Sequence, residues 1–439
     1  MIPSQKIMVP GIIVAVIALL GGCVRYRPEP LPRASDLTSG PMAAGGEGAA
    51  SVSNPLRLED AMRRAVANDP DLKAARLKAG VASAQAFAAG LIPDPTLGAD
   101  LSRSSKLDGY TLGLNEDLLA LLTLRPAKAA ARAHLRQVDL SIAWSEMQTA
   151  ERAGDEFIRA VAAERRIRSC DALIAAQGAL LRADHAEWRR GNATSEELSA
   201  ATRALNAAES ERGRALLALE TSRGTLGRLL GLAADSPLEL SVKVAVPGMD
   251  HDDFARALST LADRRLDLRA LRAGYESQEA RLRQAVLAQF PAVNIGIHRG
   301  RSAEEGVNTV GVGVDLVLPL FSRNRGTIAV ERATRSALRQ EYQARLDRAV
   351  DDARMLRQAD GELEAQLAAL TPRLAFERET VRAVRGQLER GDASWGDLVR
   401  AASALQADEA DEIDLSQSLQ QARLALRFAL GLPLVPVTP

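Results

Sequence analysis

The sequence contains few of the residues on which enzymes, metal proteins and nucleic-acid-binding proteins rely. Aromatic residues make up only 3% of its 439 residues, and it has two cysteines and four histidines. Lys+Arg and Asp+Glu each number 56, so the chain lacks the basic surplus of a surface that binds nucleic acid. Cys23 and Cys170 cannot form a disulfide framework, and the motifs of phosphate-binding loops, zinc proteases and serine hydrolases do not occur. We therefore predict no enzyme activity, no cofactor, no metal site and no nucleic-acid partner.

The beginning of the chain has the pattern of an export signal. A basic residue precedes the apolar stretch 7–20, which is followed by two glycines and Cys23. This pattern is typical of a secretory signal peptide, predicted over residues 1–22. A cysteine directly after the small residues resembles the cleavage site of bacterial lipoproteins, which implies lipid attachment at Cys23; an ordinary signal peptide with an incidental cysteine is the alternative. Residues 23–53, rich in Pro, Gly and Ser, are predicted to be an extended tether.

The rest of the sequence repeats itself with a period near 200 residues. Residues 70–97 align with 266–293, and further along the chain 189–201 align with 389–401. This period is far longer than that of the common solenoid repeats, so each copy is the size of a domain. We predict two tandem units at 54–232 and 253–433, joined by a linker at 233–252 and followed by a short tail at 434–439.

Both copies have the same expected order of elements. A run rich in the helix formers Ala, Leu, Arg and Glu comes first, at 58–90 and again at 253–288. Two short segments follow in which apolar residues alternate with glycine or polar residues, most clearly at 310–316. A period of two with one apolar face is typical of a strand. The predicted strands span about 95–104, 109–118, 291–300 and 308–318.

A very long helical hairpin is predicted after each pair of strands. Its turn lies at Gly191-Asn192 in the first copy and at Gly391-Asp392 in the second. The first outgoing arm, about 127–189, would be about 95 Å long, and Pro372 is expected to kink or break the second outgoing arm. The coiled-coil seam predicted for the first arm consists of Leu135, Val138, Ile142, Ser145 and Thr149.

The strands indicate a membrane wall that one chain cannot complete. Each is long enough to cross a bilayer when tilted. An open four-stranded sheet would expose unpaired backbone edges to lipid, so it must close by pairing with copies of itself. Two chains would give eight strands around a filled interior, and three would give twelve and leave a passage. The alternative is a lipid-anchored periplasmic coiled-coil scaffold, in which the strands form a small soluble cap.

Several motifs in a fixed order resemble the TolC-like outer-membrane efflux proteins. They are the segment LRLEDAMRRAVANDPDLKAA at 56–75, VDLVLPLFSRNRG at 314–326, the R-G-[ND]-A-[TS] turns and the G-L ends of the hairpins. The resemblance covers nearly the whole chain beyond residue 54. It implies a mainly α fold with a small membrane β-part, in which a homotrimer builds one twelve-stranded barrel. The chain would lie in the bacterial outer membrane, in contact with its lipid, with its helices in the periplasm.

The resemblance also implies a function. Ducts of this family pass substrate to the outside from an inner-membrane pump, of the RND or ABC type, through a periplasmic adaptor protein. The segments 117–132 and 319–326 look closest to members that export heavy-metal ions; drug efflux or type I secretion is the alternative. Gly191, Asn192, Gly391 and Asp392 would dock the adaptor. Asp397 matches the acidic residue that narrows the family's periplasmic entrance, whereas Arg400 stands where the family often has a second acid.

Some of these features also fit simpler structural explanations. Gly191 and Gly391 fit helix C-caps, and Asp397 fits a first-turn carboxylate favoured by the helix dipole. The acidic run at 408–414 is interpreted as a solvated helical face with compensating arginines nearby, with pore lining as the alternative. His298, on the polar side of a predicted strand, would line the lumen.

Overall fold

The computed structural model describes residues 26–35, 37, 55–103, 108–233, 236–302 and 306–435. The chain divides into two compact units, residues 1–37 and 38–439. In the first unit the described residues are exposed and contain no helix or strand. The predicted signal peptide, Cys23 and most of the tether lie outside the described residues.

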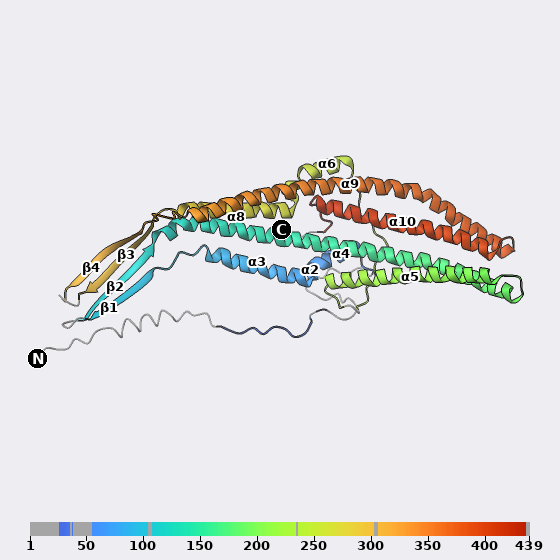
Figure 1. The fold of residues 1–439 in the computed structure, drawn as a ribbon, viewed down its shortest axis with the longest axis horizontal. Coiled ribbons are helices and arrows are strands. Elements are labelled where there is room, and N and C mark those ends of the chain that lie inside the picture. Colours follow the sequence, from blue (N-terminus) through green and yellow to red (C-terminus); the bar gives the residue numbers. More distant parts are fainter. Residues whose placement is uncertain are drawn as a thin grey trace. The chain divides into compact units, whose positions relative to one another are not determined.

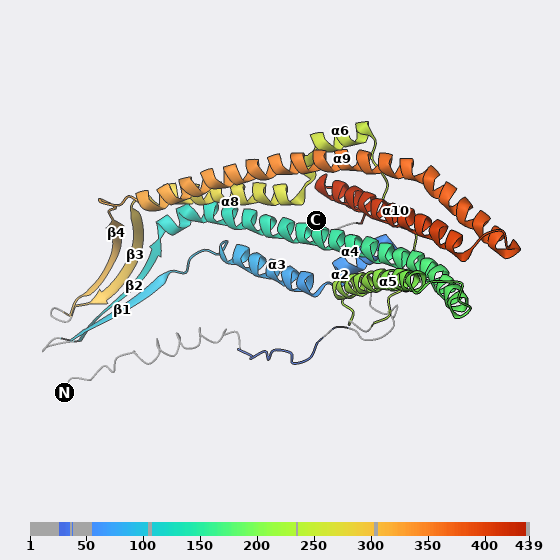
Figure 2. The same ribbon diagram turned by 45° about the vertical axis from the view of Figure 1, so that its right-hand side comes forward.

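A four-stranded antiparallel sheet lies at one end of the second unit (Figure 1). Its strands are β1 (Thr96–Arg103), β2 (Asp108–Asp117), β3 (Ala292–Arg301) and β4 (Asn308–Val317). They pair in the order β1-β2-β3-β4, so each copy of the repeat gives one hairpin and the hairpins join between β2 and β3. Figure 2 shows the strands curving alongside one another.

Two long helical hairpins extend from the sheet, and their turns lie at the far end of the same unit (Figures 1 and 2). The first consists of α4 (Leu118–Arg189) and α5 (Ser195–Leu229), the second of α9 (Arg325–Arg390) and α10 (Trp395–Ala429). With 72 residues, α4 is about 108 Å long. The predicted fold class, mainly helical with four strands, is therefore confirmed.

The shorter helical runs differ from their prediction as single helices. The first is divided into α2 (Leu58–Asn68) and α3 (Pro70–Ala88), because Asp69 caps α3 by accepting hydrogen bonds from the N–H groups of Asp71 and Leu72. A proline at the first position of a helix favours such a start. The second run is divided into α6 (His251–Ser259), α7 (Leu261–Arg264) and α8 (Leu266–Leu287).

Two prolines lie inside long helices, and the first of them contradicts a predicted boundary. α4 begins at Leu118 rather than near 127, because the Asp117 carboxylate accepts hydrogen bonds from two N–H groups of its first turn, and Pro126 lies within it. Pro372 does not break α9, although α9 bends in its second half (Figures 1 and 2). Packing of α9 along α10 offsets the single backbone hydrogen bond that a proline removes.

The predicted coiled-coil seam is only half-buried, apart from Thr149. The side chains buried along α4 are mostly small and lie on a different stripe: Ala143, Met147, Ala150, Ala153, Gly154 and Phe157. Small residues let helices approach closely; a Cβ added to Gly154 would lie only 2.8 Å from Leu424 Cδ2 of α10. The packing of these helices is therefore alanine-based rather than leucine-based.

The largest core surrounds the middle of α4, where residues of the two predicted units, 54–232 and 253–433, meet. It contains Phe157, Met62 and Met147, each at most 2% exposed. The predicted linker contributes to it: Leu240 is buried, and Leu56 forms a backbone bridge with it. None of the described helices combines the length and the hydropathy that a membrane-spanning helix requires.

Candidate functional site

One face of the sheet carries the apolar side chains of all four strands. Strand pairing places Leu97, Leu114, Ile297 and Val312 in one row across it. Neighbouring rows on this face add Leu101, Leu112, Ile295, Val310, Val314 and Leu316. Most of these side chains are exposed, Val312 to 72% and Leu101 to 79%. An apolar surface of this extent is typical of a face that lipid or another protein covers.

The opposite face is lined by glycine and polar residues. Its central row consists of Gly98, Gly113, His298 and Gly311. The His298 ring occupies the space that glycine leaves free, because a Cβ added to Gly311 would lie 2.5 Å from His298 Nε2. Asp117, Asn294 and Asp315 form a row close to the helical end of the sheet. This polar face suits contact with water.

The sheet and the helices both form open layers. β1 and β4 each pair on one side only within the described part of the chain. Near the sheet the helices contact one another in the order α3, α4, α8, α9, and near the turns in the order α5, α4, α10, α9. The flanking helices expose apolar side chains, including Leu77, Val81 and Phe87 on α3 and Met355 and Phe376 on α9.

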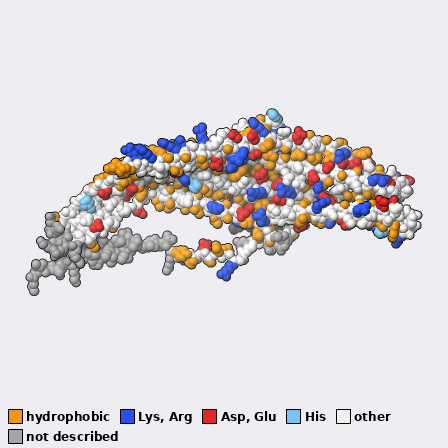
Figure 3. Space-filling view, viewed as in Figure 1, with side chains coloured by type: hydrophobic (Ala, Val, Ile, Leu, Met, Phe, Trp, Pro, Cys, Tyr) orange, Lys and Arg blue, Asp and Glu red, His pale blue; other side chains and the backbone are white. Residues whose placement is uncertain are grey.

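The acidic run 408–414 of α10 forms ion pairs with arginines of two other helices. Asp408 accepts a hydrogen bond from Arg373 Nε of α9 at 2.7 Å. Asp414 contacts Arg166 of α4 at 2.6 Å, and the other acidic residues of the run pair with Arg165, Arg373 and Arg378. This run therefore links the two hairpins, as the interpretation with compensating arginines requires. Figure 3 shows both signs of charge interspersed over the helices.

Two buried ion pairs hold the central region, and neither was apparent from the sequence. Asp267 is 5% exposed and binds Arg265 through two hydrogen bonds, of 3.0 and 2.8 Å, while the Arg265 guanidinium lies 5.1 Å from the centroid of the Trp144 ring. Asp360 of α9, 1% exposed, accepts hydrogen bonds from Arg357 at 2.9 Å and from Arg423 of α10 at 2.7 Å. Arg265 and Arg357 are close in sequence to their acids and only Arg423 is distant, so what the tertiary fold reveals is that these ion pairs are buried.

The two hairpin turns have the same backbone geometry. Gly191 and Gly391 have φ of +82° and +80°, a conformation that glycine adopts without steric strain. The next N–H groups, of Asn192 and Asp392, each donate to a carbonyl oxygen of the outgoing helix at 2.9 Å. The two turns are thus C-cap structures whose following side chains remain exposed.

A capping box begins the returning helix after each turn. Thr194 and Glu197 exchange hydrogen bonds in the first copy, and Ser394 and Asp397 do so in the second. The hydrogen bonds from the side chain and then the backbone of Ser394 lower the pKa of Asp397, and Arg400 lowers it further. Arg400 donates a hydrogen bond to Asp397. Asp397 is therefore an ionised capping residue whose charge is balanced within its own helix.

The described residues show no further chemistry-bearing cluster. Among them, no group of three or more His, Cys, Asp or Glu side chains could hold a metal ion. The Cys170 thiol is buried in α4, and this burial raises its pKa. A buried thiol with a raised pKa is a poor nucleophile.

The family comparison matches the second half of the chain. Residues 257–432 match the sequence model of the outer membrane efflux protein family. No curated protein matches the sequence.

Among solved structures, the outer membrane channel CmeC of Campylobacter jejuni is similar with a TM-score of 0.73 at 15% identity, over 93% of this chain and 94% of that chain. The outer membrane protein VceC of Vibrio cholerae is similar with a TM-score of 0.70 at 18% identity, over 85% and 96%. The open state of the MtrE outer membrane channel of Neisseria gonorrhoeae has a TM-score of 0.71 at 18% identity, over 87% and 91%. The chain therefore has the fold of these outer membrane channels, and its residues 257–432 are similar to the outer membrane efflux protein family.

Proposed function

We propose that three copies of this chain form an outer-membrane exit duct, in which each copy gives four strands to a twelve-stranded barrel. The observation that carries the proposal is the open sheet, with one exposed apolar face, one polar glycine-lined face and two edges that no described strand pairs. Lipid contact demands that such edges be closed. Closure by copies of the chain satisfies them, and the apolar face then meets lipid while the polar face lines water.

The helices support the same closure. The flank formed by α3 and α5 and the flank formed by α9 are both incomplete and both expose apolar side chains. In a ring of copies, the α9 flank of one chain covers the α3 and α5 flank of the next. Two copies would give only eight strands, whose interior side chains fill, whereas three leave a passage. We propose three copies, rather than a larger number, because the resemblance to the TolC-like family implies a trimer.

The helical tube would lie in the periplasm and meet its partners at the turns. Gly191, Asn192, Gly391 and Asp392 lie at the far end of the hairpins from the sheet, where an adaptor protein can reach them (Figure 1). An inner-membrane pump, of the RND or ABC type, would supply the energy through this adaptor. The duct itself carries no reaction.

The entrance constriction is proposed at Asp397. Its carboxylate lies in the first turn of α10 directly after the hairpin turn, and it pairs with Arg400. A ring of three such pairs would present alternating charges rather than a purely acidic ring. The cargo proposed is heavy-metal ions, with drugs or secreted polypeptides as the alternative, and genes for the adaptor and pump near this one would distinguish them.

A lipid at Cys23 would add an anchor to the barrel. The support is the sequence pattern of residues 1–23. A single acyl chain anchors a protein weakly, so the barrel would remain the main attachment to the membrane.

The test of the duct compares two double variants of the same sheet. Val312→Arg with Val314→Arg places two charges on the apolar face, and Thr111→Arg with Thr309→Arg places two charges on the polar face. An arginine facing lipid costs about 2–4 kcal/mol at mid-depth, so the first variant should be lost from the outer membrane and the second retained.

The number of chains in the assembly and the presence of a central hole are determined by imaging detergent-purified wild-type particles and measuring their mass. Trimers with a central hole support the duct, provided that the wild type and the Thr111 and Thr309 variant are both recovered normally from the outer membrane. Water-soluble monomers, or normal membrane recovery of the Val312 and Val314 variant, would favour the periplasmic scaffold instead.

A further inference from the structure

The outward face of β3 changes character towards its hairpin end. Val293, Ile295 and Ile297 point to the apolar face, and the next two residues of the same parity are Arg299 and Arg301. They are thus charged residues on the face that carries the apolar side chains. Alternation along the strand is strict, so neither arginine can turn to the polar face without a change of register.

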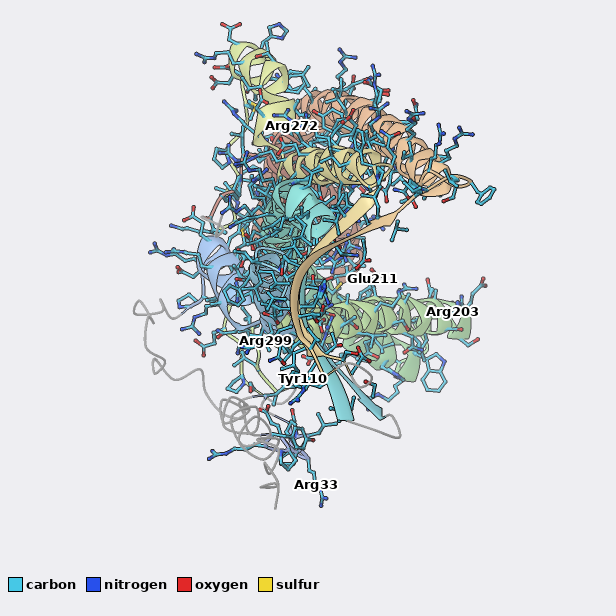
Figure 4. The ribbon with its side chains drawn as sticks, turned by 90° about the vertical axis from the view of Figure 1, so that its left-hand side faces the viewer. Arg33, Tyr110, Arg203, Glu211, Arg272 and Arg299 are labelled. Carbon is cyan, nitrogen blue, oxygen red and sulfur yellow. The ribbon has the colours of Figure 1, made fainter. Side chains whose placement is uncertain are left out.

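Strand pairing gives Arg299 two apolar neighbours and Arg301 one aromatic and one polar neighbour. Arg299 lies between Leu112 of β2 and Val310 of β4, and Arg301 lies between Tyr110 of β2 and Asn308 of β4. Figure 4 labels Tyr110 and Arg299 on the sheet. Tyrosine beside the polar boundary of an apolar band is typical of a membrane–water interface.

Neither guanidinium has a carboxylate partner among the described residues, and both side chains are exposed. This differs from the helices, where arginines such as Arg166, Arg373 and Arg423 pair with acids of neighbouring helices. Two positive charges that have no carboxylate partner within the described part of the chain, at the edge of an apolar surface, are suited to bind an anion from outside the chain.

The position of the pair in the proposed barrel identifies that anion. Arg301 is the last residue of β3, and Arg299 lies about 7 Å before it at the rise of a strand. The helices begin at the other end of the strands, so the hairpin end faces the exterior if the helices are periplasmic. The arginines then lie at the headgroup level of the outer leaflet.

We propose that Arg299 and Arg301, with Tyr110 beside them, bind the phosphate groups of the phosphorylated glycolipid (lipid A) of the outer leaflet; this inference rests on the proposed duct. Arginine presents a planar fork of N–H donors that matches two phosphate oxygens. Three copies of the chain would give three such sites around the rim. Each site would fix the barrel at a defined depth and tie it to the outer leaflet.

Arginines at a membrane boundary can also extend to water without binding a specific lipid. Lysine extends to water equally well but lacks the bidentate geometry. Comparison of Arg→Gln with Arg→Lys at both positions therefore separates phosphate recognition from extension to water.

The experiment titrates the detergent-purified full-length chain with bisphosphorylated lipid A or with the same glycolipid after removal of its phosphates. Native mass spectrometry counts the glycolipid bound to each assembly. The variants are R299Q/R301Q and R299K/R301K. The control is R332Q/R339Q, which removes two exposed arginines of α9 and changes the charge equally. Inorganic phosphate is added as a competitor.

We expect the wild type and the α9 control to bind the phosphorylated form at least tenfold more tightly than the dephosphorylated form. R299Q/R301Q should lose this preference, and R299K/R301K should lose most of it. Equal binding of the two glycolipids by the wild type would overturn the inference without any variant. Full retention of the preference by R299Q/R301Q, or displacement by equimolar inorganic phosphate, would overturn it as well.

The duct is checked separately on the same samples, by their assembly mass and by channel conductance in planar bilayers. A conducting trimer without glycolipid preference contradicts the lipid site alone. A monomer without conductance contradicts the duct, and the lipid site with it.

Discussion

Glu151 of α4 is expected to make the stability of this protein depend on pH near neutrality. Burial is the main cause that raises its pKa from 4.5 to about 7, and Asp155, one turn further along α4, adds to the rise. Arg152 and Arg265 act in the opposite direction but do not cancel it. Glu151 thus lies next to the buried ion pair of Arg265 with Asp267 and carries a charge that its surroundings disfavour.

The direction in which pH changes the stability follows from the pKa of Glu151, which is 4.5 in the unfolded chain and about 7 in the folded one. Because the folded state binds the proton more tightly than the unfolded state, the protonated carboxyl adds no penalty below pH 4.5, and stability falls as the pH rises through 7. At about 1.4 kcal/mol per pKa unit the penalty would reach about 3 kcal/mol, and partial exposure of the side chain reduces it to about 2 kcal/mol. Glu151→Gln, which cannot ionise, should remove this penalty.

The assay is thermal unfolding of the detergent-purified chain at pH 8 and at pH 4.5. We expect Glu151→Gln to be more stable than the wild type by about 2 kcal/mol per chain at pH 8, and the two to be equal within about 0.5 kcal/mol at pH 4.5. Glu209→Gln, at an exposed position of α5, is the control and should change stability by less than about 0.5 kcal/mol at both values. A gain that is the same at both pH values, or no gain at pH 8, would refute the reasoning.

Four other substitutions test the remaining parts of the structure. Asp360→Ala removes the buried carboxylate that Arg357 and Arg423 share and leaves Arg423 with Glu364 alone, so it should destabilise the chain by about 3 kcal/mol in thermal unfolding. Gly391→Ala places a side chain at a φ of +80° with open space around it, so the loss should be only about 1–2 kcal/mol and purely conformational; a stabilised variant would contradict the turn geometry. Asp397→Ala should raise single-channel conductance, and an unchanged conductance removes Asp397 from the entrance. Cys23→Ser should abolish acyl labelling while the fold stays intact, whereas persistent labelling would contradict the anchor.

The strands were the part of the fold that the sequence predicted best. Residues such as Val310, Val312 and Val314 alternate with glycine or a polar residue, and strand pairing needs only this local period together with a turn. The long helices were equally evident in type. Their boundaries were not, because the capping carboxylates Asp69 and Asp117 decide them, and packing keeps Pro126 and Pro372 within helices.

The residues of the candidate site also differ in how far the sequence predicted them. The turn glycines Gly191 and Gly391 and the capping acid Asp397 were predictable, because each acts through backbone geometry within a few residues. The outward direction of Arg299 was also present in the alternation of β3, and only the expectation of a uniformly apolar face concealed it.

The sequence alone determined the type of each element, the turns between them and the two-sided sheet, because these depend on periods of two and of about 3.6 residues along the chain. Only the tertiary structure decided which helices touch, that the acidic run of α10 pairs with arginines of α4 and α9, and that Asp360 is buried against Arg423 of α10. The physical reason is distance along the chain: these contacts join residues up to about 250 positions apart. No local period records such a contact, and it forms only when helices pack against each other.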